Sequence, residues 1–381
     1  MEMKTRVAIV GLPNVGKSSL FNALAQKSIA QSENFPFCTI EPNVAPIPVP
    51  DKYLSRLGEF ANSRRSLPAL MEWVDVAGLV KGASRGEGLG NRFLATVREC
   101  DAICHLIRCY DDPNVVHVDG RVDPLADAEV INLELLLADL DHVGRRLDKT
   151  TCKDDERDTL EKIEIGLQKG IPARALGLSE DEKFTIKSMG LLTLKPVLYT
   201  LNIDEVDFMY DREASFSRLR DSLKTIQYSD PETQLYAIVS AKFEAEIASR
   251  SQQEQHEYLV SLGMETESSI NLDSLLSYNV LPSLIQKLLN ISLVYTGPGV
   301  SPERSRTTKA YLFRDMKLNA FDMAGRLHGE IQRGFVCAEV VSAKKLLQHN
   351  SLNAARECGI VRTEGKSYLI QSEDVILIKW N

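Results

Sequence analysis

Hydrophobic residues along this chain fall into short apolar runs separated by helix-like and turn-rich stretches. Continuous apolar runs of this length, bounded by polar residues, predict strands that are buried on both faces of a sheet. Such runs cover residues 7–10, 70–75, 102–107, 196–201 and 234–239. Because helical patterns lie between these runs, we predict an α/β fold with a doubly wound, mainly parallel sheet.

About ninety residues separate the third and fourth predicted strands, although a parallel crossover needs only about a dozen. An insertion is therefore expected here. Its apolar residues follow 3-4-3 spacing in two successive segments, which is typical of paired helices. The first segment contains Val130, Leu133, Leu137, Leu140 and Leu147, and the second contains Leu160, Ile163 and Leu167. Two arrangements remain open: an antiparallel hairpin that projects from the domain, and two helices packed flat on the sheet.

The first predicted strand runs directly into residues 11–18, which match the spacing G-x-x-x-x-G-K-[ST]. A strand, a glycine-rich loop and a helix start in this order predict a phosphate-binding loop. Glycines allow consecutive backbone N–H groups to surround a phosphate, and the helix N-terminus favours its negative charge. Lys17 would reach the terminal phosphates and the Ser18 hydroxyl would bind Mg²⁺. The residues expected to contact the phosphates are Asn14, Val15, Gly16, Lys17, Ser18 and Ser19.

Two further segments fit a magnesium site beside this loop. The predicted strand at 70–75 ends in Asp75, and Gly78 follows with the spacing D-x-x-G. Behind a phosphate loop, such an aspartate holds Mg²⁺ through a water molecule, while the glycine N–H meets the γ-phosphate. Thr39 lies in a proline-punctuated loop between the two motifs and is the candidate for a threonine hydroxyl on the metal.

The motifs do not by themselves supply a residue that positions the attacking water. Many switches carry a glutamine directly after D-x-x-G, but this chain has Leu79 there, and an apolar side chain cannot orient a water molecule. Either another residue takes that role, or hydrolysis is slow and depends on a partner. His117, in a loop after the third predicted strand, is the candidate to act with Lys17 in catalysis. The alternative is a loop histidine without a catalytic role.

The base-recognition segment departs from the guanine-specific pattern N-K-x-D. This chain has Asn202, Ile203 and Glu205 at the Asn, Lys and Asp positions. Glutamate is one methylene longer than aspartate, so the paired hydrogen bonds to guanine are compromised and adenine becomes a serious candidate. The loop after the fifth predicted strand would line the base with Ser240, Ala241 and Lys242. ATP is therefore the expected substrate, and a GTP-specific protein is the alternative.

Composition narrows the remaining possibilities. The net charge of −8 argues against nucleic-acid binding through the whole surface, although a local basic face is compatible with it. Seven cysteines without a C-x-x-C pair fit reduced thiols. Cys100, Cys104, His105 and Cys109 could suggest zinc, but residues 102–107 fit a buried strand better. We find no export signal and no apolar stretch of about 18 residues, so we expect no membrane span.

Taken together, these motifs resemble those of the Obg-like ATPases of the YchF type, which are P-loop proteins of the translation-factor class. The matching segments extend over nearly the whole chain. They are the phosphate loop with Asn14, residues 34–40, 75–83 and 86–91, the non-standard 202–205, and the C-terminal runs 324–328 and 333–340. The last two runs resemble a TGS domain, a small β-grasp module. Residues 368–370 and 375–378 are predicted to be its closing strands.

The resemblance implies three domains and several functional properties. The domains are a P-loop ATPase domain at 1–124 and 192–290, a helical insertion at 125–191 and a TGS domain at 294–381. The implied properties are hydrolysis of ATP in preference to GTP, a catalytic role for His117, and K⁺ coordination beside the phosphates at Asn14. Similar proteins are associated with the ribosome, so we expect the large subunit or ribosomal RNA as partner, in the cytoplasm, and no DNA. A nucleotide-dependent adaptor with incidental hydrolysis is the rival function.

Overall fold

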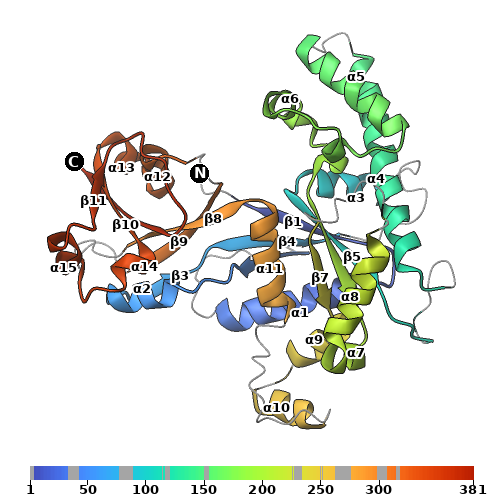
Figure 1. The fold of residues 1–381 in the computed structure, drawn as a ribbon, viewed down its shortest axis with the longest axis horizontal. Helices are drawn as coiled ribbons and strands as arrows, with labels where there is room; N and C mark the ends of the chain where they lie inside the picture. The colour runs from blue at the N-terminus through green and yellow to red at the C-terminus, as the bar shows by residue number, and fades with distance from the viewer. Residues whose placement is uncertain are drawn as a thin grey trace.

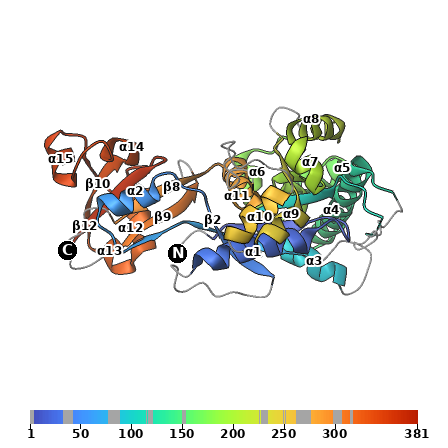
Figure 2. The same cartoon turned by 90° about the horizontal axis from the view of Figure 1, so that it is seen from below.

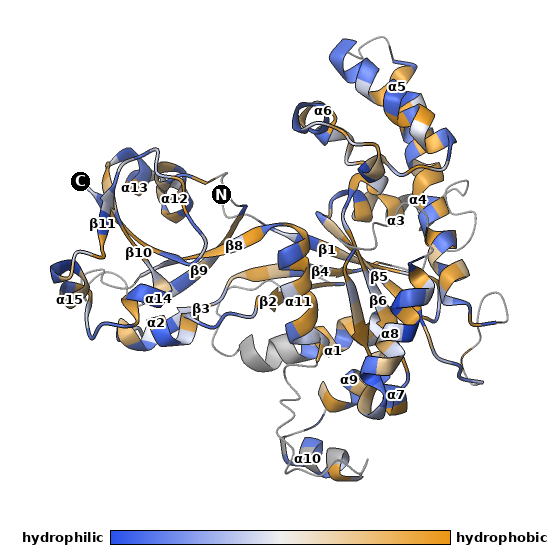
Figure 3. Cartoon of the chain, viewed as in Figure 1, coloured by the Kyte–Doolittle hydropathy of each residue, from blue (hydrophilic) through white to orange (hydrophobic). Residues whose placement is uncertain are grey.

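Two six-stranded sheets organise the chain, one in an N-terminal P-loop domain and one in a C-terminal module (Figure 1). Colouring by hydropathy places the apolar residues mainly along the strands, while many helices carry both apolar and polar residues (Figure 3). The computed structural model describes residues 4–32, 43–76, 89–113, 115, 121–149, 154–224, 226, 234–248, 250, 252–261, 276–297, 307–314 and 318–381.

The sheet of the P-loop domain has the strand order β2-β4-β1-β5-β6-β7. All neighbouring pairs are parallel except β2 with β4. The strands are β1 Arg6–Val10, β2 Val44–Pro48, β4 Leu70–Asp75, β5 Ala102–Arg108, β6 Val197–Asn202 and β7 Tyr236–Val239. The predicted strands and the mainly parallel sheet are confirmed. The carboxyl ends of its parallel strands lie at one edge, where ligands bind in sheets of this kind.

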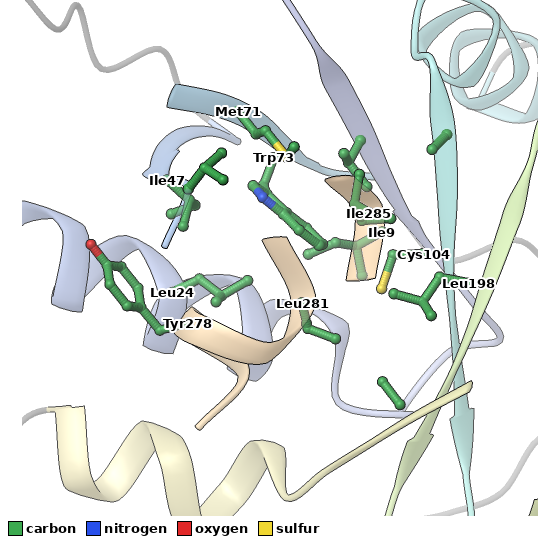
Figure 4. Packing of buried hydrophobic residues seen from close by; sticks show 14 of the residues in the cluster. Ile9, Leu24, Ile47, Met71, Trp73, Cys104, Leu198, Tyr278, Leu281 and Ile285 are labelled. Atoms are coloured by element: carbon green, nitrogen blue, oxygen red, sulfur yellow. The ribbon is translucent and has the colours of Figure 1, made fainter. Parts of the chain in front are cut away.

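Helices surround this sheet and bury its apolar residues. Leu281 and Ile285 of α11 belong to the same buried cluster as Ile9 and Trp73 of the sheet, and α11 lies beside α1 (Figure 4). This packing fixes the strands whose ends carry the candidate site. The helices of this part are α1 Lys17–Ser32, α3 Leu89–Arg98, α7 Glu205–Tyr210, α8 Arg212–Leu223, α9 Ala241–Ala248, α10 Gln252–Ser261 and α11 Ser277–Leu288.

The insertion is an arm built on α4 (Pro124–Leu147) and α5 (Asp154–Gln168), which pack against each other. The first half of α4 packs in the core of the P-loop domain, and its second half joins α5 in a separate apolar cluster. Figure 1 shows the far end of this pair extending away from the sheet. The arm returns through α6 Glu180–Thr185 and the short 3₁₀ turns η2 Ala173–Ala175, η3 Lys187–Met189 and η4 Leu192–Leu194.

The prediction of which apolar residues of α4 form its buried face is wrong in part. Leu133 is 55% exposed, whereas Ile131 and Leu135 are buried. The physical reason is that α4 packs against two different partners along its length, so one continuous heptad seam does not describe its buried face. In α5 the predicted positions Leu160, Ile163 and Leu167 are buried as expected.

The C-terminal module has the strand order β11-β10-β12-β8-β9-β3, with β12 parallel to its neighbour β8. A hairpin of β8 and β9, a helix, and the later strands β10 and β12 follow one another along the chain, as in a β-grasp fold. Its strands are β3 Arg65–Leu67, β8 Ile291–Thr296, β9 Thr307–Arg314, β10 Phe335–Ser342, β11 Arg362–Glu364 and β12 Asp374–Trp380. Its helices are α12 Ala320–Leu327, α13 Gly329–Arg333, α14 Ala343–Leu346 and α15 Leu352–Glu357.

One predicted strand of this module is not formed. Residues 368–370 make only a single bridge, between Leu369 and Asn319. A turn instead leads into β12: the Gln371 N–H donates to the Asp374 carboxylate at 2.9 Å, and the Tyr368 hydroxyl donates to the same oxygen at 2.8 Å. The strand predicted at 375–378 is confirmed within β12.

The C-terminal sheet takes its edge strand from the N-terminal half of the chain. Residues 65–67, which the predicted domain boundaries place in the ATPase domain, form β3 and pair in parallel with β9. The helix before it, α2 (Leu54–Phe60), contacts β9 and lies among the elements of the module in Figures 1 and 2. Tyr295 adds a hydrogen bond from its hydroxyl to Asp51 Oδ1 at 2.9 Å. The segment between β2 and β4 therefore joins the two sheets.

Candidate functional site

The phosphate loop lies between the end of β1 at Val10 and the start of α1 at Lys17. Asn14 and Gly16 have positive φ angles of 62° and 96°. A Cβ at Gly16 would lie 2.6 Å from the side-chain nitrogen of Asn202, and a Cβ at Gly11 would lie 2.4 Å from the Leu106 carbonyl oxygen. Both glycines are therefore required by close approach, and the loop has the backbone that a phosphate cradle needs.

Lys17, Ser18 and Asp75 come together at this loop, as the sequence predicts. The buried Lys17 Nζ donates a hydrogen bond to the Leu12 carbonyl at 2.6 Å. Ser18 Oγ donates to Asp75 Oδ2 at 2.9 Å. The second carboxylate oxygen, Asp75 Oδ1, is buried and has no hydrogen-bond partner in the part of the chain that the structure describes. A hydroxyl beside a carboxylate with a spare oxygen is a donor set that suits a hard divalent cation.

Burial governs the titration of these charged groups. It lowers the pKa of Lys17 to about 8, and the negative charge of Asp75 only partly opposes this. Burial likewise raises the pKa of Asp75, opposed by the hydrogen bond from Ser18 and the charge of Lys17. A lysine in this state gains from the arrival of an anion, because the anion restores the interactions that water no longer supplies.

The lowered pKa of Lys17 predicts a pH-dependent stability. Between pH 8 and 10.5 the unfolded chain binds more protons than the folded one, so the unfolding free energy rises with pH in that window. We expect a rise of about 2 kcal/mol from pH 8 to 10 that the Lys17→Met variant lacks. Urea unfolding of both nucleotide-free proteins measures it, and parallel pH curves for the two proteins would contradict the assignment.

Asn202 links three segments of the site. At the end of β6 its Nδ2 donates to the Val15 carbonyl at 2.9 Å, and its Oδ1 accepts from the Ala241 N–H at 2.9 Å. The side chain is buried. Its amide thus holds the phosphate loop and the loop after β7 in place, which is a positioning role.

Replacing Asn202 with alanine should weaken nucleotide binding indirectly, because its amide bonds to the protein backbone at both ends. The variant loses both links and leaves the Ala241 N–H without its partner, so we expect an unfolding free energy lower by about 1–3 kcal/mol. Nucleotide affinity should fall by roughly tenfold as the loop becomes less ordered. Fluorescence titration and urea unfolding report the two effects. Asn353→Ala, in the exposed turn of α15, is the matched control, and equal behaviour of the two variants would argue against the positioning role.

The base-side residues lie close together at the ends of β6 and β7. Ile203 is buried, and its N–H donates to the Val239 carbonyl at 2.9 Å. Glu205 begins α7, with its carboxylate 3.7 Å from Lys242 Nζ. Ser240 Oγ is buried and has no partner among the described residues. The structure therefore brings the predicted base-side residues together and leaves a hydroxyl there available for a ligand.

Two residues near the site were not predicted from the sequence. Tyr258 of α10 lies with its hydroxyl 3.4 Å from Glu205. Arg108, at the end of β5, is fully buried and donates to the carbonyls of Tyr110, Asp112 and Val115 at 3.0–3.2 Å. Neither belongs to a spacing motif, although an arginine at the end of an apolar strand is an unusual feature that could have indicated a role. Arg108 orders the start of the loop that leads toward residue 117.

Three predicted site residues lie outside the described residues, namely Thr39, Gly78 and His117. The buried strand predicted at 102–107 is confirmed as part of β5. Within the described ranges, no group of three or more histidine, cysteine, aspartate or glutamate side chains could hold a metal ion. Among the helices in those ranges, none combines the length and apolar character needed to cross a membrane.

Comparison with known proteins gives full-length matches. A family model described as "50S ribosome-binding GTPase" matches residues 6–137, and one described as "Protein of unknown function (DUF933)" matches 305–381. Proteins named "Ribosome-binding ATPase YchF" from Bacillus subtilis (strain 168) and Escherichia coli O157:H7 are 40% and 39% identical, over 100% of both chains in each case. The solved structure of the Schizosaccharomyces pombe YchF GTPase has a TM-score of 0.78 and 30% identity, covering 99% of this chain and 98% of that one. The bacterial relatives are named ATPases and the Schizosaccharomyces pombe relative is named a GTPase. The nucleotide preference of this chain therefore has to be argued from its base-side residues.

Proposed function

This chain belongs to the YchF family, and on that premise we propose that it is an ATP-hydrolysing switch protein that binds the ribosome. The observation that carries the proposal is the arrangement of Lys17, Ser18 and Asp75 at the end of a glycine loop. An ammonium, a hydroxyl and a carboxylate at this place are the groups that P-loop enzymes use for phosphoryl transfer. Neighbouring residues complete the proposed mechanism.

The backbone N–H groups of residues 14–19 would hold the β- and γ-phosphates, with Lys17 supplying positive charge. Ser18 Oγ and, through a water molecule, Asp75 would hold a magnesium ion, and the unpartnered Asp75 Oδ1 fits this role. Bound there, Mg²⁺ would neutralise charge on the phosphate oxygens. Thr39 is proposed as a further ligand, and the Gly78 N–H as a contact to the γ-phosphate.

Water attacks the γ-phosphate in line with the leaving oxygen, so one group must orient that water. We assign this role to His117, and Arg108 supports the assignment because it anchors the start of its loop. Asn14 is assigned as the residue that would bring K⁺ beside the phosphates. These roles are proposals for the residues named, and the base preference can be tested separately.

ATP is the favoured nucleotide because Glu205 and Ile203 replace the guanine-reading pair. Glu205 also lies beside Lys242 and Tyr258, which compete for its carboxylate. A carboxylate that is already engaged is a poorer acceptor for the two N–H groups of guanine. The bacterial relatives carry ATPase in their names, in agreement with this argument. GTP is the second candidate, because the Schizosaccharomyces pombe relative is named a GTPase.

Competition between unlabelled ATP and GTP for a fluorescent ATP analogue tests the proposal. We expect ATP to bind at least ten times more tightly, a gap of about 1.4 kcal/mol. Glu205→Asp should raise the affinity for GTP relative to ATP by roughly tenfold, because it restores the geometry of the guanine contact. Glu213→Asp, at an exposed position of α8, is the matched control. Tighter binding of GTP by the unaltered protein would reverse the nucleotide assignment.

The partner and location are inferred from the family. We propose the ribosome as partner, with a large-subunit or ribosomal-RNA contact, and the cytoplasm as location. The C-terminal module is proposed to be a TGS domain. Cosedimentation of the full chain with ribosomes in the presence of ATP tests the partner. If hydrolysis were abolished by His117→Ala while ribosome binding persisted, the protein would act as a nucleotide-dependent adaptor.

A further inference from the structure

A cavity of about 280 Å³ lies where the chain returns from the arm to the P-loop domain. Helix α4 contributes Asn132 and Leu133 to its lining, and the returning chain contributes Arg174 of η2 and Thr193 of η4. We call this cavity the α4–η2 pocket. None of its lining residues is among those assigned above to the nucleotide or the metal ion. Its chemistry therefore needs a separate explanation.

The guanidinium of Arg174 lines this pocket without a carboxylate partner among the described residues. Its Nη1 donates to the Thr193 carbonyl at 3.3 Å, and its other polar neighbour is the Tyr199 hydroxyl. Burial lowers the pKa of Arg174, and only the charge and hydrogen bonding of Tyr199 oppose that shift. Glu129, the acidic residue of the lining, is exposed on α4. A cation withdrawn from water without a counter-ion is unfavourable, so an anion that reached it would be bound.

The charge of Arg174 also acts on the interior of the domain. Tyr199 is fully buried on β6, and its hydroxyl accepts a hydrogen bond from Asn132 Nδ2 at 3.1 Å. The centre of its ring lies 5.4 Å from that of His105 on the adjacent strand β5. Burial lowers the pKa of His105 to about 3, and the positive charge of Arg174 contributes to this shift. The charge is therefore not cancelled within the described chain and is available to a ligand.

Apolar side chains form much of the remaining lining, including Leu133, Leu136, Pro172 and Ile226. Leu133 is 55% exposed, so it offers apolar surface beside the cation. A few polar groups in an apolar lining are typical of a small-molecule site. The planar guanidinium of Arg174 matches the two oxygens of a carboxylate, and one cation balances one negative charge. A phosphate group carries about 1.5 to 2 charges at pH 7 and fits a single arginine less well.

We propose that the α4–η2 pocket binds a small monocarboxylate with an apolar body. The carboxylate pairs with Arg174, and the apolar body covers Leu133 and its apolar neighbours in the lining. Such a ligand contacts both α4 and the chain that returns from the arm, so it fixes the base of the arm to the P-loop domain. A ligand that binds only the folded chain also stabilises it. This site goes beyond the ATP hydrolysis proposed above and does not depend on it.

Hexanoate is the probe, titrated into the full-length protein and followed by ligand-observed NMR. Hexanamide has the same chain without the charge, and inorganic phosphate has charge without the chain. Hexanoate should bind saturably and at least about tenfold more tightly than either, because hydrogen bonds to a charged group add that much. Arg174→Met should weaken hexanoate binding by about tenfold or more. Arg333→Met, at an exposed position of α13, is the matched control and should leave it unchanged.

Leu133→Asp gives a second test that does not require Arg174→Met to fold. Leu133 is exposed, so the melting temperature should change little, while the new carboxylate competes for Arg174 and excludes hexanoate. Ile165→Asp, at a similarly exposed position of α5, is the matched control. Equal affinity of Leu133→Asp and the unaltered protein for hexanoate, or binding no tighter than that of hexanamide, would show the inference to be wrong. Tighter binding of phosphate would overturn the carboxylate assignment. ATP hydrolysis, measured separately, decides the proposed function.

Discussion

Replacing Lys17 with alanine is expected to reduce the rate of ATP hydrolysis by roughly 10²- to 10³-fold, equivalent to about 2.7–4 kcal/mol of transition-state stabilisation. The reason lies in where the ammonium is held. It is buried at the phosphate loop, 2.6 Å from the Leu12 carbonyl, and its positive charge acts on Asp75. Charge that develops on the transferring phosphoryl group would otherwise face only backbone dipoles and the metal.

The same substitution should not destabilise the fold. Lys17 is a buried cation whose desolvation lowers its own pKa, so removing it relieves a cost. Single-turnover phosphate release and thermal melting report the two effects independently. Lys183→Ala, an exposed lysine of α6, is the matched control and should change neither. Hydrolysis within about threefold of normal in Lys17→Ala would show that this loop is not the catalytic centre.

Asp139→Ala should cost about 3–5 kcal/mol of unfolding free energy, which is large beside typical single substitutions. Asp139 is fully buried on α4 and serves three donors at once. One oxygen pairs with Arg98 of α3, while the other accepts from the backbone and hydroxyl of Thr193 at 2.7 and 2.8 Å. The variant leaves the Arg98 guanidinium without its anion in the space between α3, α4 and the returning chain.

Asp141→Ala provides the comparison, because it removes an aspartate from the same helix two residues away. Its pair with Arg145 is exposed, so the loss should stay below about 1 kcal/mol. Urea unfolding of the two variants, with equal m-values, gives the difference directly. A similar small loss in both would mean that the buried network of Arg98, Asp139 and Thr193 does not hold the arm to α3.

Structural features that depend on residues close together in the chain can be predicted from the sequence. Each parallel strand is buried on both sides, so it appears as an apolar run, and the phosphate loop is recognisable because its chemistry requires glycines, lysine and serine at fixed spacing. The pairing of Ser18 with Asp75 is also predictable, because the loop that leads to Ser18 follows the carboxyl end of β1 and Asp75 ends the adjacent parallel strand β4. The family resemblance is confirmed by full-length relatives.

Features that depend on distant segments could not be predicted in this way. Asn202 is expected from its motif to contact the nucleotide, but its amide is used to bridge two loops that become neighbours only in the folded sheet. The buried face of α4 changes along the helix because two separate cores compete for it. Arg108 was missed for a different reason: it belongs to no motif, although the three carbonyl groups that it binds follow within seven residues.

The edge strand β3 has a consequence for how the protein is made. Arg65 pairs with Thr307, about 240 residues later in the chain. At a synthesis rate of about 5–20 residues per second, the segment that holds β3 waits roughly 10 to 50 seconds for its partner. That segment connects β2 with β4, which ends in Asp75, so the edge of the C-terminal sheet that it forms is completed only when the last quarter of the chain has been translated. A product truncated before residue 307 would leave β3 as an edge strand without its partner, and would lack part of the apolar core that β8 and β9 share with the P-loop domain.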